Sequence, residues 1–188
     1  MQRRQDDSPR IGISACLLGE EVRYDGGHKR DLYIVETLGP LVEWVPVCPE
    51  VELGLGTPRE AIRLICNPKD PEAINLVSRS GNDLTVKMRR FARRRARELA
   101  KENLSGYILK KDSPSCGMER VKIWNEHNQE ISERQGRGFF ADELLRQFPN
   151  LPMEEEGRLH DPQLCENFIE RVFSFRKLRA QFAAQWTV

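Results

Sequence analysis

Short apolar segments alternate with longer helical patterns along this chain. Residues 10–19 (RIGISACLLG), 41–48 (LVEWVPVC) and 106–111 (GYILKK) are rich in β-branched and aromatic residues, which is typical of buried strands. Residues 30–39 and 84–102 instead carry apolar side chains at helical spacing. Because strands alternate with helices, we expect an α/β fold whose sheet is largely parallel and flanked by helices.

The pattern that follows extends this Rossmann-like arrangement. Residues 61–67 and 74–86 are shorter strand-like pieces, and residues 121–124 (VKIW) return to an extended pattern. Helical spacing recurs over 136–150 and over 162–186, so the fold should end in a C-terminal helical extension. In parallel sheets the ligand crevice lies beyond the carboxyl ends of the strands, and we expect the functional site there.

Length and charge limit the number of domains and the classes of partner. A chain of 188 residues suits one main domain. Thirty basic residues balance 29 acidic ones, so the net charge of +1 gives the whole molecule no general attraction to nucleic acid. The N-terminal residues are polar and no run of about 18 apolar residues occurs, so we expect a cytoplasmic protein with no membrane partner.

The five cysteines divide into two kinds. An odd number in a cytoplasmic chain favours reduced thiols over a disulfide framework. Cys66 and Cys165 lie inside a strand-like and a helical pattern, as ordinary core residues do. Cys16, Cys48 and Cys116 instead follow apolar strands and are flanked by Gly, Pro or Ser. A parallel sheet would bring these three thiols to one rim.

The spacing of the three thiols limits the kinds of site that they could form. Separations of 32 and 68 residues match no zinc finger, whose ligands come in close pairs, but they suit a soft metal site assembled by the fold. A 4Fe-4S cluster normally takes four cysteines, so three ligands would leave one iron open as a Lewis acid. A nucleophilic cysteine and a three-thiolate zinc site are the alternatives, and both would use a nearby histidine. His28 is the candidate, whereas we expect His127 and His160 at the surface.

Three segments, in order, resemble the thiouracil desulfurase family: 13–27 (ISACLLGEEVRYDGG), 45–60 (VPVCPEVELGLGTPRE) and 106–122 (GYILKKDSPSCGMERVK). The resemblance covers residues 10–150 and implies an iron-sulfur desulfidase domain. It also implies an oxygen-sensitive 4Fe-4S cluster whose three cysteine ligands are Cys16, Cys48 and Cys116, with one open iron.

Residues 136–173 are similar to a longer subgroup of that family, in which a second domain follows. That subgroup is implicated in removing sulfur from 4-thiouridine, including 4-thiouridine in tRNA. By this resemblance, residues 151–188 would be an extended segment and C-terminal helix that link to a second domain, which the chain lacks.

The implied reaction is a non-redox desulfuration of thiolated uracil compounds to uracil or uridine and hydrosulfide. A soft thiocarbonyl sulfur would bind the open iron, and water would add to the ring carbon. Glu50 is our candidate for the acid-base group, and Ser113, Ser115 and Lys110 are candidates for hydrogen bonding or orienting the substrate. Weaker candidates for contact with a thiolated pyrimidine are Tyr24, Asp25, His28 and Glu60.

Residues 87–101 carry eight Lys or Arg and only one acidic residue, which makes a surface that could follow RNA phosphates. A solvated helix face is the commoner meaning of such a run. A rival interpretation is therefore a non-catalytic metal-binding module that presents this basic helix to RNA. A thiol-based enzyme without metal is the third hypothesis.

Overall fold

The computed structural model describes residues 8–67, 70–127 and 129–185. Its central sheet, sheet A, has four strands in the order β2-β1-β5-β8, and every neighbouring pair is parallel. These strands are β1 (Arg10–Ser14), β2 (Glu43–Val47), β5 (Leu104–Leu109) and β8 (Met153–Glu155). The predicted α/β fold with a parallel sheet is confirmed.

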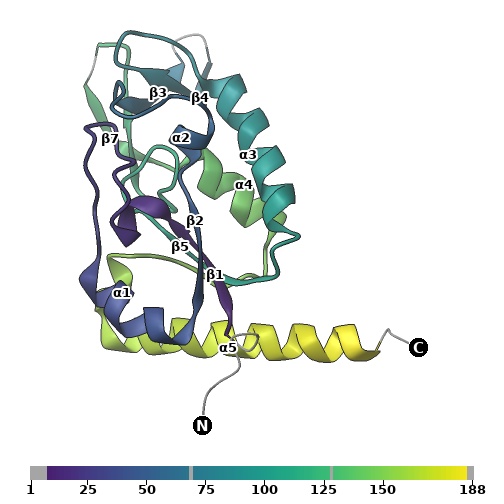
Figure 1. The fold of residues 1–188 in the computed structure, drawn as a ribbon. Coiled ribbons are helices and arrows are strands. Elements are labelled where there is room, and N and C mark those ends of the chain that lie inside the picture. Colours follow the sequence, from purple (N-terminus) through teal and green to yellow (C-terminus); the bar gives the residue numbers. More distant parts are fainter. Residues whose placement is uncertain (1–7, 68–69, 128, 186–188) are drawn as a thin grey trace.

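Helices cover both faces of sheet A (Figure 1). On one face, Ile11, Ile13 and Ile108 pack against α1 (Leu32–Leu38) and α5 (Pro162–Gln185). The opposite face, with the fully buried Tyr107, packs against α3 (Thr85–Leu99) and α4 (Phe139–Gln147). This alternation of sides along β5 follows the two-residue period of a strand.

A second sheet, sheet B, lies beyond the carboxyl ends of the sheet A strands (Figure 1). Its order is β4-β3-β6-β7, with β3 parallel to β6 and antiparallel pairs outside. The strands are β3 (Ile62–Asn67), β4 (Asp70–Ser78), β6 (Val121–Trp124) and β7 (Glu130–Gly136). The sequence indicated strand-like pieces here but not a separate sheet, because pairing between segments some 60 residues apart leaves no local pattern.

The segment after residue 150 packs on the same core. Its extended part contains β8, which pairs with β5, and the first half of α5 buries Phe168 and Val172 against sheet A. In its second half Leu178 and Phe182 are exposed. The helix was predicted over 162–186, and Trp186 lies outside the described residues. The domain boundary at 150 and the linker role of 151–188 stay predictions.

Short helical turns complete the chain: η2 (Ala15–Leu18), η3 (Gly39–Leu41), α2 (Pro49–Glu52) and η4 (Arg158–His160). Two of them, η2 and α2, directly follow strands of sheet A and so lie at its functional rim. Within the described part of the chain, no helix has both the length and the apolar composition needed to cross a membrane.

Candidate active site

The three thiols singled out in the sequence meet at one cavity of about 630 Å³. Cys16 lies in η2 after β1, Cys48 follows β2 directly, and Cys116 lies in the turn after β5. These strands are neighbours in the order β2-β1-β5, so the chain passes from β1 to β2 on one side and later returns to β5 on the other side of β1. The cavity therefore lies at a topological switch point, where α/β sheets bind their ligands.

Backbone hydrogen bonds fix the first two cysteine segments. The carbonyl of Cys16 accepts from the amide of Gly19 (3.3 Å) and from that of Lys29 (2.9 Å). Gly19 has φ 102°, a left-handed conformation that costs glycine little. At the second segment, the Cys48 thiol donates to the carbonyl of Val22 (3.6 Å), which joins it to the loop after η2. Pro49 begins α2 and ends the strand pairing.

The third cysteine turn is held from inside and from outside. Within it, the Ser113 hydroxyl accepts from the backbone amides of Ser115 (3.2 Å) and Cys116 (3.0 Å). From outside, the first amides of α4, those of Phe140 and Ala141, donate to the carbonyl of Ser115 (2.9 and 3.1 Å). The otherwise unpaired N–H groups of a helix start are thereby satisfied, and the turn has little freedom.

Burial dominates the electrostatics of the thiols. It raises the pKa of Cys16 to about 11, with the neighbouring Cys48 adding to the increase and the Lys110 ammonium opposing it. Burial also raises the pKa of Cys48, and it raises that of Cys116 well above the ordinary value. The Ser14 hydroxyl acts in the opposite direction on Cys116. All three are thus neutral thiols at pH 7, and a metal must displace their protons to bind.

The donor set is soft and consists of sulfur. Within the described residues, no three His, Cys, Asp or Glu side chains are arranged to hold a single metal ion. A 4Fe-4S cluster places each ligand on a different iron, so its cysteines surround it and do not converge on one point. Three thiols around one cavity fit that requirement, and thiolates are the preferred ligands of iron-sulfur clusters.

Glu50 lies in the cavity wall with both carboxylate oxygens engaged. Its Oε2 accepts from Nε and Nη2 of Arg59 (2.9 and 2.7 Å), and its Oε1 accepts from the Ser115 hydroxyl (3.0 Å). Ser115 is fully buried and contacts Glu50 from behind the cavity lining, whereas Ser113 lines the cavity. The sequence analysis did not single out Arg59, although it stands beside Glu60 in the motif TPRE.

The last residue of β8 and the residue after it, Glu155 and Glu156, supply two further carboxylates that were not among the predicted site residues. Glu156 accepts from the ammonium of Lys110 and from the amide of Lys111 (2.7 Å). Glu155 accepts from the amide of Met118 (2.7 Å). Both side chains are buried, and both hold the segment that carries Cys116. The run of three Glu at 154–156 was visible in the sequence, but its role could not be predicted. Only the pairing of β8 with β5 shows that these carboxylates reach the third cysteine segment.

The weaker candidates are only partly brought into the site. Tyr24 is 44% exposed and lines the cavity. Asp25, His28 and Glu60 are not among the lining residues: Asp25 accepts from the amide of Gly27 (3.1 Å), His28 Nδ1 from that of Arg30 (3.1 Å), and Glu60 from the Ser80 hydroxyl (2.7 Å).

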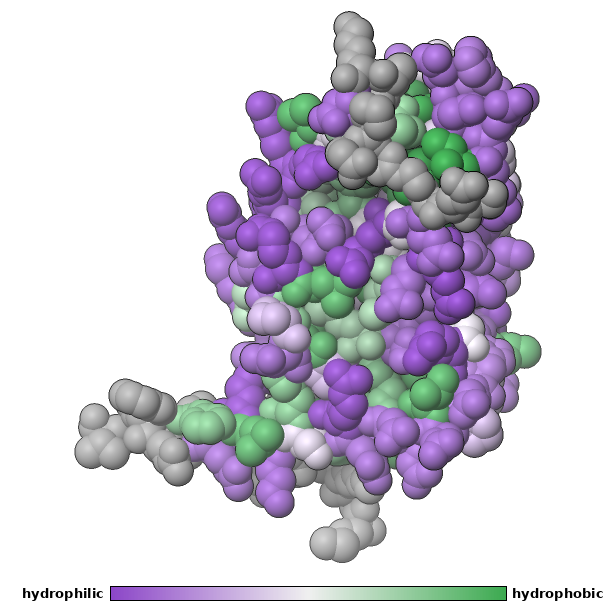
Figure 2. Space-filling model, turned by 180° about the vertical axis from the view of Figure 1, so that it is seen from behind, coloured by the Kyte–Doolittle hydropathy of each residue, from purple (hydrophilic) through white to green (hydrophobic). Residues whose placement is uncertain are grey.

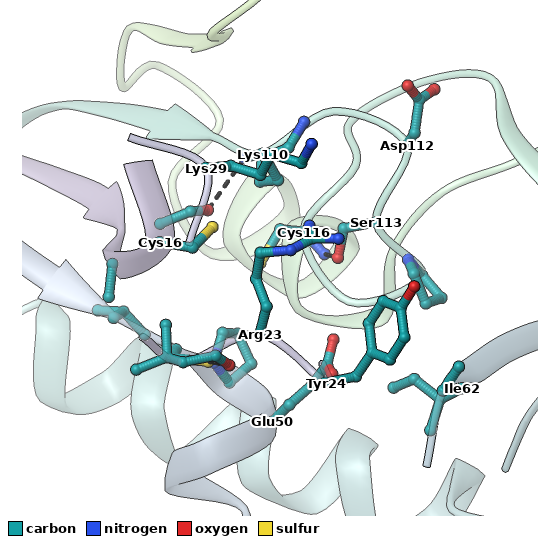
Figure 3. A pocket seen from close by; sticks show the side chains of 18 of the residues that line it. Cys16, Arg23, Tyr24, Lys29, Glu50, Ile62, Lys110, Asp112, Ser113 and Cys116 are labelled. Carbon is teal, nitrogen blue, oxygen red and sulfur yellow. Dashed lines mark hydrogen bonds between the residues drawn. The ribbon is translucent and has the colours of Figure 1, made fainter. Parts of the chain in front are cut away.

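Cationic side chains surround the thiols. Figure 3 shows Arg23, Lys29 and Lys110 around the two labelled cysteines, Cys16 and Cys116, with Tyr24 and Glu50 at the other side of the cavity. All of them line it. Arg23 also lies over the Tyr24 ring, with its guanidinium carbon 5.5 Å from the ring centre. The cavity thus combines soft donors, the carboxylates of Glu50 and Asp112, and several cations.

This arrangement defines an α/β protein with a three-thiol site at the switch point of a parallel sheet. Residues 11–156 match the family model of 2-thiouracil desulfurase, and the chain belongs to this family. The resemblance carried by the three cysteine motifs is thereby confirmed. Membership of the subgroup that acts on 4-thiouridine in tRNA stays a prediction.

Two particular proteins are similar to this chain. The uncharacterized protein YbbK of Bacillus subtilis (strain 168) is 35% identical over 114 residues, which span 57% of this chain and 72% of YbbK. A solved structure described as the 4Fe-4S-dependent thiouracil desulfidase TudS is 28% identical, with a TM-score of 0.63. The match covers 85% of this chain and 99% of TudS, so the two share their fold over nearly all of TudS.

Proposed function

We propose that this protein removes sulfur from thiolated uracil compounds and holds a 4Fe-4S cluster on Cys16, Cys48 and Cys116. The observation that carries the proposal is the meeting of these three thiols, from three adjacent parallel strands, at one cavity. Family membership and the described activity of TudS support the choice of substrate and cofactor. A cluster with one open iron would supply a Lewis acid that polarises the carbon-sulfur bond.

In the proposed reaction, the side chains of the cavity supply the proton transfer. Glu50 accepts a proton from the attacking water through Oε1, because this oxygen accepts only from Ser115 and keeps a free lone-pair direction, whereas Oε2 already accepts two bonds from Arg59. The new carbon-oxygen bond replaces the carbon-sulfur bond: one proton of the water leaves on sulfur as hydrosulfide, and the other passes through Glu50 to the ring nitrogen, which is unprotonated in a substrate bound as its thiolate. No electron is gained or lost, so the proposed reaction is a hydrolytic cleavage.

Tyr24 and Lys110 have binding roles in this scheme. The exposed ring of Tyr24 at the cavity offers a flat surface on which a pyrimidine can stack. Lys110 is held by Glu156 and keeps its positive charge near Cys16. We assign it the role of stabilising negative charge that develops as sulfur leaves. Ser113 uses its hydroxyl to shape the cysteine turn.

We further propose that the substrates include 4-thiouridine, free or in tRNA. α3 is the candidate RNA surface, although three of its seven cations form ion pairs: Arg93 with Glu143, Arg94 with Glu98, and Arg95 with Glu52. Lys87, Arg90 and Arg94 line a groove of about 580 Å³ on α3. Glu52 also lines this groove and is the last residue of α2, which begins next to Cys48. The groove therefore lies close to the second cysteine segment.

Anaerobic reconstitution tests the proposal and separates it from the rival binding module. We expect about four irons per chain, broad absorbance near 400 nm, and sulfide release from 4-thiouracil or 4-thiouridine. Iron binding and tRNA binding without sulfide release would favour the non-catalytic module. Sulfide release from protein free of iron would favour a metal-free thiol enzyme and overturn the proposal.

Single replacements of Cys16, Cys48 and Cys116 by alanine test the ligand assignment. Each should lower iron to well below four per chain and abolish turnover, because a cluster with two ligands is poorly held. Cys165→Ala is the control, since Cys165 is buried in the core between sheet A and the helices α1 and α5. Full iron retention in the Cys116→Ala protein would contradict the assignment.

Glu50→Gln separates chemistry from cluster binding. The amide keeps the size of the side chain but cannot take a proton, so we expect kcat to fall by about 10²- to 10⁴-fold while the iron content stays at the wild-type level. Steady-state sulfide release and iron analysis of the same sample measure both. Unchanged turnover would remove Glu50 from the mechanism.

A further inference from the structure

Arg59 is a buried cation with an unusually complete set of hydrogen bonds. It lies in the loop between α2 and β3, and its side chain is only 6% exposed. Two of its nitrogens contact the same oxygen of Glu50, and Nη1 donates to the carbonyl of Gly56 (2.9 Å). An arginine held in this way has one orientation, because its planar guanidinium must satisfy partners on two sides.

The contacts of Arg59 connect all three cysteine segments. Its backbone amide donates to the carbonyl of Tyr24 (2.9 Å), in the loop that follows Cys16. Its guanidinium holds Glu50, two residues after Cys48. Glu50 in turn accepts from Ser115, the neighbour of Cys116. A continuous chain of hydrogen bonds thus runs from the first segment through the second to the third.

Two other contacts also join the cysteine segments to one another. Ser14 accepts from the amide of Lys110 (3.0 Å), which links the ends of β1 and β5. The Cys48 thiol contacts Val22, but a thiol that binds iron loses its proton and can no longer donate. The contact between Arg59 and Glu50 needs no cysteine proton, so it persists when the ligands are deprotonated.

We propose that Arg59 is the positioning residue of this site. It orients Glu50 toward the substrate and ties together the three segments that bear the cluster ligands. The inference rests on the proposed function for its effect on turnover and on the proposed cluster ligands for its effect on cluster retention, while the contacts of Arg59 are those of the structure. Arg59 lines the cavity beside Glu50, and acts through Glu50 and the loops.

The test compares Arg59→Lys, Arg59→Ala and the wild type after anaerobic reconstitution. Lysine keeps the charge but cannot make the double contact with Glu50 and the bond to Gly56 together. Turnover is expressed per cluster, from iron content and absorbance near 400 nm. We expect kcat to fall about tenfold in Arg59→Lys and about 100-fold in Arg59→Ala, with KM changed less than about twofold. Iron loss to a chelator should be several-fold faster in both.

Chemical rescue distinguishes positioning from general damage. The space vacated in Arg59→Ala opens to the cavity, so guanidinium ion at a concentration that leaves the wild type folded should raise kcat about tenfold. An equal concentration of ammonium should not. Arg10→Ala is the matched control: Arg10 also pairs with a carboxylate (Glu102, 2.7 Å) and a backbone carbonyl, but at the amino end of β1. It should retain wild-type kcat and iron.

The two hypotheses fail in distinguishable ways. A wild-type protein that holds four irons but releases no sulfide would refute the proposed function, and the rates of iron loss would still decide the role of Arg59. Wild-type rates of iron loss and of turnover per cluster in Arg59→Lys and Arg59→Ala would overturn the inference. A fall in kcat that guanidinium and ammonium restore equally, or that neither restores, would also overturn it.

Discussion

At the residue scale, the buried carboxylates beside the third cysteine have two opposing effects on stability. Glu155 and Glu156 are 8% and 6% exposed, although carboxylates are rarely buried without partners. Their partners are the backbone amides of Met118 and Lys111 and the ammonium of Lys110. These bonds hold the cysteine turn at the cost of desolvating two neighbouring negative charges.

Glu155→Gln should change the pH dependence of stability. Burial raises the pKa of Glu155, while the bonds from Met118 and Glu119 oppose the shift. An acid whose pKa is raised on folding stabilises the fold below its unfolded pKa and loses that contribution as pH rises through the folded pKa. Glutamine keeps an acceptor oxygen without the charge, so its stability relative to wild type should increase from pH 4 to pH 7.

Urea unfolding of both proteins across this pH range measures the difference. The bond from the Glu119 amide is long, at 3.4 Å, and contributes little to the stability of either protein. A difference that stays constant with pH would contradict the assignment of the buried charge.

The residues of the candidate site were predictable from sequence to different degrees. Cys16, Cys48 and Cys116 were identified as candidates from the local sequence, because each follows a strand pattern and is flanked by Gly, Pro or Ser. Arg59 and Glu156 were not recognisable, because no local pattern shows that the loop brings Arg59 back onto Glu50 or that Glu156 pairs with Lys110, 46 residues away. Local spacing also favoured His28 and Glu60, whose side chains bond within their own loops or to Ser80.

At the element scale, the start of α4 serves the cysteine turn. Its first amides donate to the carbonyls of Pro114, Ser115 and Gly117. This close approach requires the glycine at position 138: a Cβ there would lie 2.5 Å from the backbone carbonyl of Ser115 and 2.7 Å from the amide of Cys116. Helix and turn therefore touch backbone to backbone.

Gly138→Ala should displace the cysteine turn. The methyl group meets backbone atoms that cannot rotate away, so we expect a loss of about 1–3 kcal/mol in stability and a lower iron content. Gly39→Ala is the matched control, because a Cβ at position 39 makes only an ordinary contact, 3.7 Å from Trp44. Urea unfolding of the unloaded proteins and iron analysis after reconstitution give the two readouts. Wild-type iron content in Gly138→Ala would show that the turn has more freedom than its hydrogen bonds imply.

Strands β1, β2 and β5 of sheet A and helix α3 were predictable because each carries its own pattern. Residues 84–102 gave helical spacing and α3 spans Thr85–Leu99, with the difference confined to the ends. Sheet B was not predictable, since its parallel pair joins β3 to β6 across α3 and β5. β8 has only three residues and too little length for a periodic pattern.

At the scale of the whole molecule, α5 has two parts with different environments. Its first half closes one face of sheet A, while its second half runs past the body of the protein with apolar side chains exposed (Figure 2). Figure 1 shows the same helix crossing sheet A near the start of β1. The stabilising part of α5 is therefore the part that shares a core with β1 and β5.

Two phenylalanines on α5 should separate these parts. Phe168 is 2% exposed, and Phe168→Ala should lower the free energy of unfolding by about 3–5 kcal/mol. Phe182 is 60% exposed, and Phe182→Ala should change it by less than about 0.5 kcal/mol. Urea unfolding of the two variants measures both values. Equal losses would mean that the second half of α5 is also buried in solution.

The order of the strands in sheet A has a consequence for biosynthesis. The three thiols come from β1, β2 and β5, and the carboxylate that holds Lys110 follows β8, so the site spans 141 positions from Cys16 to Glu156. A ribosome-bound chain that has emerged only as far as Cys48 presents two of the three thiols and none of the β5 contacts. The proposed cluster would accordingly find its complete ligand set, and the contacts that hold it, only after translation has passed residue 156.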